Sequence, residues 1–262
     1  MKKSNICPVQ SRRITVMCMF ILLIALLLIL FVIPPVEAQE AEISPPVISY
    51  DSLQQVEKIE HVIIGGRRYS TELERLDLSG FGLSCEDIAP LAYLTNLYWL
   101  NLGNNQIRDI SPLENLYNLH VLCLSYNQIS DISPLANLIN LEALNFHNNY
   151  VRDISPLANM SVLNGLSLSY NQISDLTPII GNPPLTALWA DNNQISDLSP
   201  LYGHPNLSAI WLSNNNISDL TVFSSLPNLD ALVIENNPVS DWSVVSHLEN
   251  IVGKEKAPQN DS

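Results

Sequence analysis

A repeat of 22 residues runs through most of the chain and constrains its fold more than any other feature of the sequence. The frame L-x-x-L-x-L-x-x-N-x-I-x-D-I-x-P-L begins at Leu97, Leu119, Leu141, Leu163, Leu185, Leu207 and Leu229. A degenerate copy, two residues longer, begins at Leu73. A period of this length is typical of a solenoid, in which each repeat contacts only its neighbours.

The first part of each copy predicts a short β-strand. Leu119, Leu122 and Leu124 alternate with small or polar residues, which indicates a strand with one buried face. One such strand cannot bury its apolar face alone, so the copies are expected to stack into a parallel sheet. With about 4.8 Å between strands, the sheet should be roughly 34 Å wide.

Asparagine recurs at one offset after the strand, at Asn105, Asn127, Asn149, Asn171, Asn193, Asn215 and Asn237. The chain has to turn sharply there, and its buried backbone groups need hydrogen-bond partners. A short amide side chain both donates and accepts, and it tolerates turn backbone. We therefore interpret these asparagines as an internal hydrogen-bond ladder rather than as a binding surface.

Aspartate also recurs once per copy, at Asp109, Asp131, Asp153, Asp175, Asp197, Asp219 and Asp241. Calcium takes about six to eight clustered oxygens, and one carboxylate per repeat is far from that, so we interpret the aspartates as turn caps. In the Ser-Pro and Thr-Pro pairs that follow, Ser111 is expected to be the N-cap and Pro112 the first residue of a short helical turn.

The N-terminus has the features of an export signal. Residues 1–13 form a basic segment, and residues 14–33 contain no charge and would span about 30 Å as a helix. The positive-inside rule places residues 1–13 in the cytosol and the repeats outside. The length of the apolar run favours an uncleaved transmembrane anchor, whereas Val36-Glu37-Ala38 resembles a signal-peptidase site before Gln39. The repeats would be displayed on the cell membrane in the first case and secreted in the second.

The rest of the chain divides into four expected segments. Residues 34–50 form a proline-rich acidic linker, 51–96 the N-terminal cap with the degenerate repeat, 97–251 the regular repeats, and 252–262 a disordered tail. In the cap we expect a strand at residues 61–64, a turn at residues 65–66, and a capping box at residues 84–87 that opens a helix. At the other end, Trp242 and Leu248 are available to close the core.

Charge and cysteine content exclude several classes of function. The chain has a formal net charge of −14, and the residues after position 38 comprise 8 basic and 25 acidic ones, a net charge of −17. Such a surface repels nucleic acid. Cys85 and Cys123 fit neither a disulfide framework nor a metal site, and no catalytic motif of the kind C-x-x-C, H-E-x-x-H or G-x-S-x-G occurs. We expect a monomer without enzymatic activity, cofactor or metal.

The repeats resemble those of a known family. The segment NNQIRDISPLENLYNLHVLCLSYNQISDISPLANLINLEALNF resembles the 22-residue repeats of bacterial internalin-like proteins, and residues 63–102 resemble the first-repeat region of secreted leucine-rich-repeat proteins. The resemblance covers about 190 residues. It implies an α/β solenoid, a leucine-rich-repeat horseshoe with a parallel sheet on the concave face and short helical or 3-10 turns on the convex face. It also implies protein binding outside the cytoplasm. The immunoglobulin-like domain and the L-P-x-T-G sequence of many relatives do not follow the repeats in this sequence, which leaves host-cell invasion in doubt.

In such a solenoid, the strand residues between the leucines point to the concave side. The candidate ligand-binding residues on this side are Trp99, Tyr126, Asn145, His147, Tyr170, Trp189, Asp191, Trp211, Val233 and Glu235. Trp189 and Trp211 occupy equivalent positions in adjacent copies, so their rings should lie about 5 Å apart. Alanines flank them and are expected to leave both rings open. Tryptophan is enriched among interface hot spots, although the two rings could instead pack on each other and shield the sheet.

Trp99 is a weaker candidate because it could pack against the N-terminal cap. His147 and Asp191 lie two copies apart with no nucleophile beside them, which argues against acid–base catalysis.

The leading hypothesis for the function is a protein-binding module. The alternatives are a carbohydrate or cell-wall binder, since stacked aromatic rings also hold sugars, and a membrane-anchored sensor ectodomain that would need a partner in the membrane.

Overall fold

The computed structural model describes residues 59–246, 248 and 250–253. The expected basic segment, apolar run and linker at residues 1–50 lie outside the described residues, as does the tail beyond Gly253. Within the described part of the chain, no helix is both long enough and apolar enough to cross a membrane.

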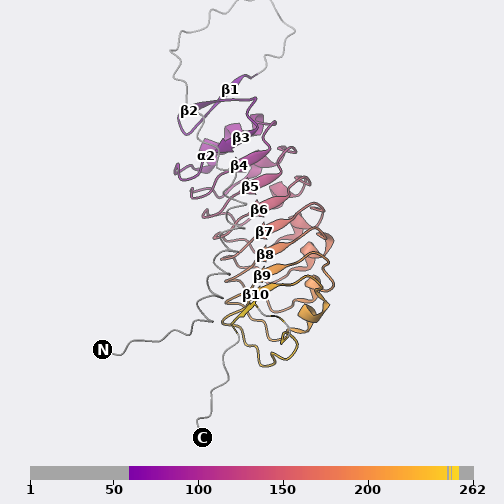
Figure 1. Ribbon diagram of the computed structural model, residues 1–262. Helices are drawn as coiled ribbons and strands as arrows, with labels where there is room; N and C mark the ends of the chain where they lie inside the picture. Colours follow the sequence, from indigo (N-terminus) through magenta and orange to yellow (C-terminus); the bar gives the residue numbers. More distant parts are fainter. Residues whose placement is uncertain (1–58, 247, 249, 254–262) are drawn as a thin grey trace, which may run out of the picture. The chain divides into compact units, whose positions relative to one another are not determined.

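The repeats form a parallel sheet of nine strands in sequence order from β3 to β11 (Figure 1). The strands are β3 (Arg75–Asp77), β4 (Trp99–Asn101), β5 (Val121–Cys123), β6 (Ala143–Asn145), β7 (Gly165–Ser167), β8 (Ala187–Trp189), β9 (Ala209–Trp211), β10 (Ala231–Val233) and β11 (Asn250–Val252). Strands β3 to β10 pair residue for residue between equivalent positions of adjacent copies. The expected solenoid is confirmed, and β11 adds a strand that the repeat frame did not predict.

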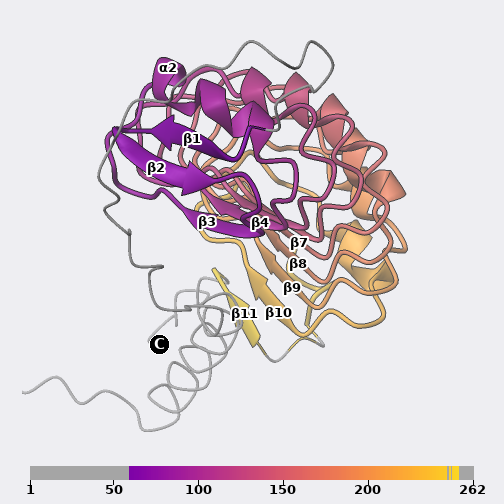
Figure 2. The ribbon, with the colours of Figure 1, turned by 90° about the horizontal axis from the view of Figure 1, so that it is seen from above.

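Short 3-10 turns run along the side of the solenoid opposite the sheet (Figure 2). They are η1 (Ala89–Tyr93), η2 (Ser111–Leu113), η3 (Ser133–Leu135), η4 (Ser155–Leu157), η5 (Thr177–Gly181), η6 (Ser199–Leu201) and η7 (Thr221–Ser225). One detail of the prediction was wrong: Ile110, not Ser111, precedes η2 as its cap residue, and it makes no side-chain cap hydrogen bond.

The recurring aspartates cap these turns. Asp109 Oδ1 accepts a hydrogen bond of 2.8 Å from the backbone N–H of Ser111, two residues later. The other six aspartates of the series make the same bond at 2.7–2.8 Å. The interpretation of these aspartates as turn caps is therefore confirmed. Serine or threonine begins each of the turns η2 to η7, and the aspartate two residues earlier supplies the acceptor.

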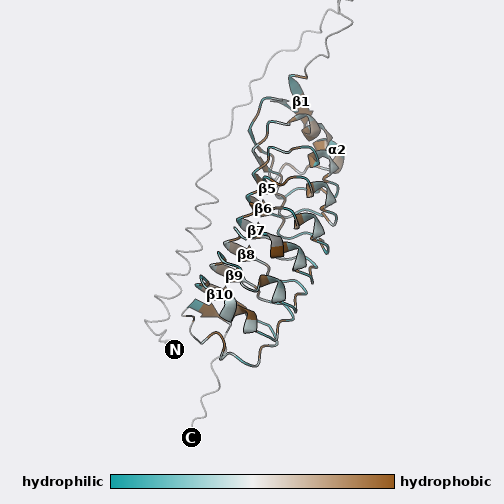
Figure 3. Ribbon diagram, turned by 90° about the vertical axis from the view of Figure 1, so that its right-hand side faces the viewer, coloured by the Kyte–Doolittle hydropathy of each residue, from teal (hydrophilic) through white to brown (hydrophobic). Residues whose placement is uncertain are grey.

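Between the sheet and the turns lies one continuous apolar core. Leucines and isoleucines of all copies fill it, and most of them are fully buried. In strands β3 to β10 the middle residue is buried in the core, and the residues on either side of it are more exposed, except for the buried Ala187 and Ala209. Figure 3, which colours the ribbon by hydropathy, shows hydrophobic and hydrophilic stretches interspersed through the coils.

The predicted internal hydrogen-bond ladder of asparagines is confirmed. Asn149 Nδ2 donates to the carbonyl oxygens of Leu124 and Phe146, each at 3.0 Å. Its Oδ1 accepts from the N–H of Ile129 at 2.9 Å. One side chain thus joins two neighbouring copies and satisfies backbone groups that are shielded from water. The same set of bonds recurs at the other six ladder asparagines.

A second asparagine ladder, which the repeat frame does not include, lies just before strands β5, β6, β9 and β10. Asn118 Nδ2 donates to Thr95 O at 2.9 Å, and Asn140 Nδ2 donates to Tyr117 O at 2.8 Å. Asn206 and Asn228 repeat this bond further along the solenoid. Each bond again links one copy to the preceding one, so amides hold the coils together at both ends of the strands.

Both ends of the core are covered as expected. At the front, β1 (His61–Ile64) and β2 (Arg67–Ser70) form an antiparallel hairpin. The helix α2 (Cys85–Ile88) begins at a capping box between Ser84 and Asp87. At the back, Trp242 and Leu248 pack against the core while remaining partly exposed.

The ladder predicts a large effect of Asn149→Ala on stability. The substitution leaves one N–H and two carbonyl groups without their partner, and each buried group left unpaired costs about 1–3 kcal/mol. We expect the free energy of unfolding, measured by urea denaturation, to fall by at least about 2 kcal/mol. Asn137, which is exposed, is the matched control, and Asn137→Ala should change it by less than about 0.5 kcal/mol. Equal effects of the two substitutions would contradict the structural role of the ladder.

Candidate functional site

The predicted site residues lie on the outward side of the sheet, which we call the open face. It comprises the first and third residues of strands β3 to β10, the residues that follow two positions later, and Tyr126 and Tyr170 at its edge. The middle residue of each strand is in the core, so the side chains on either side of it point away from the core. Trp99, Asn145, Trp189, Trp211 and Val233 occupy strand positions.

Trp189 and Trp211 stack on one another. Their ring centroids are 5.0 Å apart and the ring planes differ by 11°, which matches the expected spacing. Both side chains are half-buried, so the rings are less open than the sequence suggested. The flanking Ala187 and Ala209 are themselves buried. The pair is a flat aromatic surface that packs on itself and still reaches solvent.

Trp99 lies at the other end of the sheet and has a different neighbour. The guanidinium of Arg75, on the adjacent strand β3, lies 5.4 Å from the centroid of the Trp99 ring. This distance is within the range of a cation–π interaction. Trp99 therefore has a cation–π partner, Arg75, within its own chain.

Tyr126, His147 and Tyr170 form a second aromatic group, which we call the aromatic row. The His147 ring lies 5.0 Å from the Tyr126 ring and 5.1 Å from the Tyr170 ring, with edge-to-face geometry on both sides. His147 Nε2 is 3.2 Å from Tyr126 Oη. Both tyrosines are more than half exposed, at 53% and 52%. The three residues come from three successive copies and present one continuous ring surface.

The two tyrosines have an unusual backbone. Tyr126 and Tyr170 have φ values of 54° and 56°, in the left-handed region. The equivalent residue in the other five regular copies is asparagine, which tolerates this conformation better than other residues with a Cβ. A bulky residue in this region is uncommon, and such strain clusters at sites of function. The left-handed residue precedes the ladder asparagine, so the turn conformation predicted for the ladder position was wrong by one residue.

Asp191 connects the two aromatic groups. It follows Trp189 by two residues, and Ser169, which precedes Tyr170, donates a hydrogen bond of 3.3 Å from its Oγ to Asp191 Oδ2. Asp191 Oδ1 accepts from the N–H of Ser213 at 2.9 Å. Burial raises the pKa of Asp191 above its ordinary value, against the opposing effect of these hydrogen bonds and of His147. The carboxylate is thus fixed in place and only partly solvated.

The remaining predicted residues have simpler surroundings. Asn145 Oδ1 accepts from the N–H of His147 at 3.0 Å, so this side chain supports the backbone that carries the aromatic row. Val233 is half-buried and is paired in register with Trp211. Glu235 is exposed, and its carboxylate has no hydrogen-bond or ion-pair partner among the described residues.

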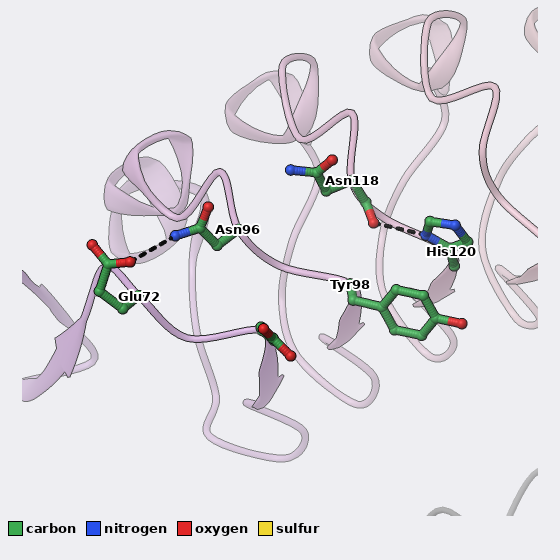
Figure 4. Close-up of a pocket in the computed structure, with 6 residues that line it drawn as sticks. Glu72, Asn96, Tyr98, Asn118 and His120 are labelled. Atoms are coloured by element: carbon green, nitrogen blue, oxygen red, sulfur yellow. Dashed lines mark hydrogen bonds between the residues drawn. The ribbon is translucent and has the colours of Figure 1, made fainter.

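An open pocket of about 530 Å³ at the N-terminal end of the sheet was not predicted. Figure 4 shows its lining residues, which include Glu72, Asn96, Tyr98, Asn118 and His120. The rings of Tyr98 and His120 stack with centroids 4.3 Å apart, and Asn96 Nδ2 donates to Glu72 Oε2 at 3.1 Å. These residues stand just before the strands, in positions that the repeat frame does not specify. Glu72, Tyr98 and His120 are acidic or aromatic, whereas Asn96 and Asn118 occupy the position of the second asparagine ladder.

The cysteines and the potential metal ligands of the described residues lie apart from one another. Cys85 and Cys123 are both free, and Cys85 Sγ accepts from the N–H groups of Arg108 and Asp109 at 3.3 Å. No group of three or more histidine, cysteine, aspartate or glutamate side chains is arranged to hold a metal ion among the residues described.

The electrostatics of the aromatic row predict the titration of His147. Burial lowers the pKa of His147 below its ordinary value of 6.5, and the negative charge of Asp191 partly opposes this effect. The unfolded chain therefore binds the proton first as pH falls, so this residue reduces stability as pH falls below 6.5 towards its folded pKa. In an NMR titration, we expect the midpoint of His147 below 6.5, and a lower one in Asp191→Asn. A midpoint at or above 6.5, or an upward shift in the variant, would contradict this electrostatic description.

The chain is similar to known leucine-rich-repeat proteins in sequence and in structure. A family model described as leucine-rich repeats in two copies matches residues 117–159, 162–203 and 205–250. No curated protein sequence matches. The crystal structure of an internalin, InlF, from Listeria monocytogenes is 38% identical with a TM-score of 0.67, and the match covers 72% of this chain and 56% of that one.

Two further solved structures are similar. Internalin C2 from Listeria monocytogenes is 33% identical with a TM-score of 0.66, and the match covers 71% of this chain and 83% of the relative. A leucine-rich-repeat protein from Leptospira interrogans is 26% identical with a TM-score of 0.59, and 65% of this chain and 50% of that chain are covered. The repeats, the sheet with its 3-10 turns and these similarities together show that the chain belongs to the internalin-like leucine-rich-repeat proteins.

Proposed function

We propose that this chain binds a protein partner outside the cytoplasm through the open face of its sheet, with Trp189 and Trp211 at the centre of the site. Leucine-rich-repeat proteins of the internalin type are non-catalytic protein-interaction scaffolds, and relatives of this type are surface or secreted bacterial proteins. The apolar run at residues 14–33 supports export of this chain as well.

The observation that carries the proposal is the stacked tryptophan pair. The same strand position holds Asp77, Asn101, Cys123, Asn145, Ser167 and Val233 in the other copies. The sheet therefore forms with small or polar residues there, and folding does not require two tryptophans. Tryptophan is enriched at interface hot spots because it offers a large rigid surface at a low cost in conformational entropy. The partly exposed stack fits a protein ligand that completes its burial.

The aromatic row extends the proposed surface towards the N-terminal copies. Its two tyrosines keep a left-handed backbone that asparagine adopts at the same position elsewhere in the array. A strained backbone at two exposed tyrosines does not stabilise the fold, and this supports a role of the two tyrosines in binding. We propose that a partner contacts Tyr126, His147 and Tyr170 in addition to the tryptophan pair.

Removal of both rings tests the proposal. The full-length chain carrying Trp189→Ala/Trp211→Ala is expected to lose capture of partners from a library of secreted and cell-surface proteins, by at least about ten-fold, because hot-spot truncations cost about 2 kcal/mol or more. Thermal unfolding should show that the variant remains folded, since loss of an aromatic pair costs about 0.5–1.5 kcal/mol beyond the buried area.

The matched control removes two exposed rings that lie outside the strands. Tyr117 and Tyr202 are 50% and 76% exposed, so Tyr117→Ala/Tyr202→Ala takes away as many rings from another part of the surface. Capture should be unchanged in this control. If the tryptophan variant binds as well as the control, the proposed site is wrong. Binding to a glycan array that depends on the same tryptophans would instead support the carbohydrate alternative.

A further inference from the structure

The half of the solenoid that carries the tryptophan pair contains no lysine or arginine. From residue 153 to residue 253 the sequence has seven aspartates and two glutamates, and no basic residue except the histidines. The side chain of Arg152, the last cation before this stretch, is held by a hydrogen bond of 2.7 Å from its Nε to Gln172 Oε1. The tryptophan pair therefore lies in a part of the chain whose formal charge is entirely negative.

At the other end of the sheet, a tryptophan of the same face lies next to a cation. Trp99 has the Arg75 guanidinium 5.4 Å from its ring centroid. A cation held over a tryptophan face is attracted by the ring quadrupole, and the attraction grows when the groups are desolvated. The stretch from residue 153 to residue 253 has no lysine or arginine to give Trp189 and Trp211 an equivalent partner from their own copies.

Two carboxylates stand beside the tryptophan pair on the same face. Asp191 lies two residues beyond Trp189, and Glu235 lies two residues beyond Val233, which pairs in register with Trp211. Side chains two positions apart on a strand share one face. Asp191 is fixed by hydrogen bonds from Ser213 and Ser169. The Glu235 carboxylate is exposed and unpaired among the described residues.

From this arrangement we infer that the protein partner presents a basic segment. An arginine or lysine side chain lies over the Trp189–Trp211 stack, with its charged group beside Asp191 and Glu235. This inference rests on the proposed function and adds the chemistry of the partner. Flat aromatic rings flanked by carboxylates suit guanidinium in particular, because its planar group stacks on rings and forms paired hydrogen bonds to a carboxylate. An acidic segment would meet only negative charge there.

A peptide probe with matched charge variants tests the inference. The affinity of the full-length chain for a fluorescently labelled hexa-arginine peptide is compared with that for a hexa-glutamate peptide by anisotropy, at low and at high salt. We expect binding of hexa-arginine that weakens with salt, and no comparable binding of hexa-glutamate. Asp191→Asn/Glu235→Gln should weaken hexa-arginine binding about five-fold or more, and Trp189→Ala/Trp211→Ala should weaken it as well.

The control removes the same charge from the same half of the chain. Asp175 and Asp197 are exposed turn caps whose Oδ1 accepts a backbone hydrogen bond, a role that asparagine keeps. Asp175→Asn/Asp197→Asn should therefore change hexa-arginine binding by less than about two-fold. Equal weakening by both pairs, or equal binding of the two peptides, would overturn the inference, because attraction would then depend on net charge alone or be absent.

The two proposals fail in different ways. If the tryptophan variant loses its protein partners while Asp191→Asn/Glu235→Gln leaves hexa-arginine binding unchanged, the proposed function stands and the basic partner is wrong. If the tryptophan variant keeps its protein partners, the proposed function fails whatever the peptides do. A partner whose binding does not depend on the two carboxylates would likewise contradict the inference.

Discussion

No single coil of this protein can bury its own leucines or satisfy the backbone at its own turn, and the rest of the structure depends on that constraint. The ladder asparagines resolve it for the polar groups: each bonds backbone groups of its own copy and of the copy before it, as Asn149 does with Phe146 and Leu124. The leucines resolve it for the apolar groups by forming one core through all copies. Stacking is therefore obligatory, and the fixed period follows from it.

This constraint separates the residues that build the protein from those that can serve a ligand. Leucine, asparagine and aspartate recur because their contacts recur in every coil. The side chains on the open face do not make contacts that recur in every coil, and the residue type at these positions differs between the copies. Trp189, Trp211, Tyr126 and Tyr170 stand out for that reason. For the two tyrosines the left-handed backbone adds a cost on the order of 1–2 kcal/mol each, which the core of this solenoid has to offset.

The period predicted the register of the sheet, the face on which each candidate lies and the roles of the asparagine and aspartate ladders. It could not predict features outside the frame. The second ladder is interrupted by Val162 and Pro184, so its periodicity is weak, and β11 follows a copy that has lost the Ser-Pro pair. The N-cap was misassigned because the sequence pattern does not show whether Asp109 or Ser111 supplies the hydrogen-bond acceptor.

Burial of polar residues was the hardest feature to predict. Asn182 and His204 take the core position that Leu116, Leu138 and Met160 fill in earlier copies. The side-chain amide of Asn182 and the Nδ1 atom of His204 have no hydrogen-bond partner among the described residues. A polar residue in the sequence indicates a surface position, so only the structure shows this local defect in the core.

The central claim is that a protein partner binds the open face and covers its aromatic residues. Hydroxyl-radical footprinting of the full-length chain, read by mass spectrometry, measures the oxidation rate of each tryptophan and tyrosine with and without a captured partner. We expect the partner to slow the oxidation of Trp189, Trp211, Tyr126 and Tyr170 and to leave that of Tyr202 and Trp242 unchanged. Protection of Tyr202 or Trp242, with unchanged oxidation of the tryptophan pair, would contradict it.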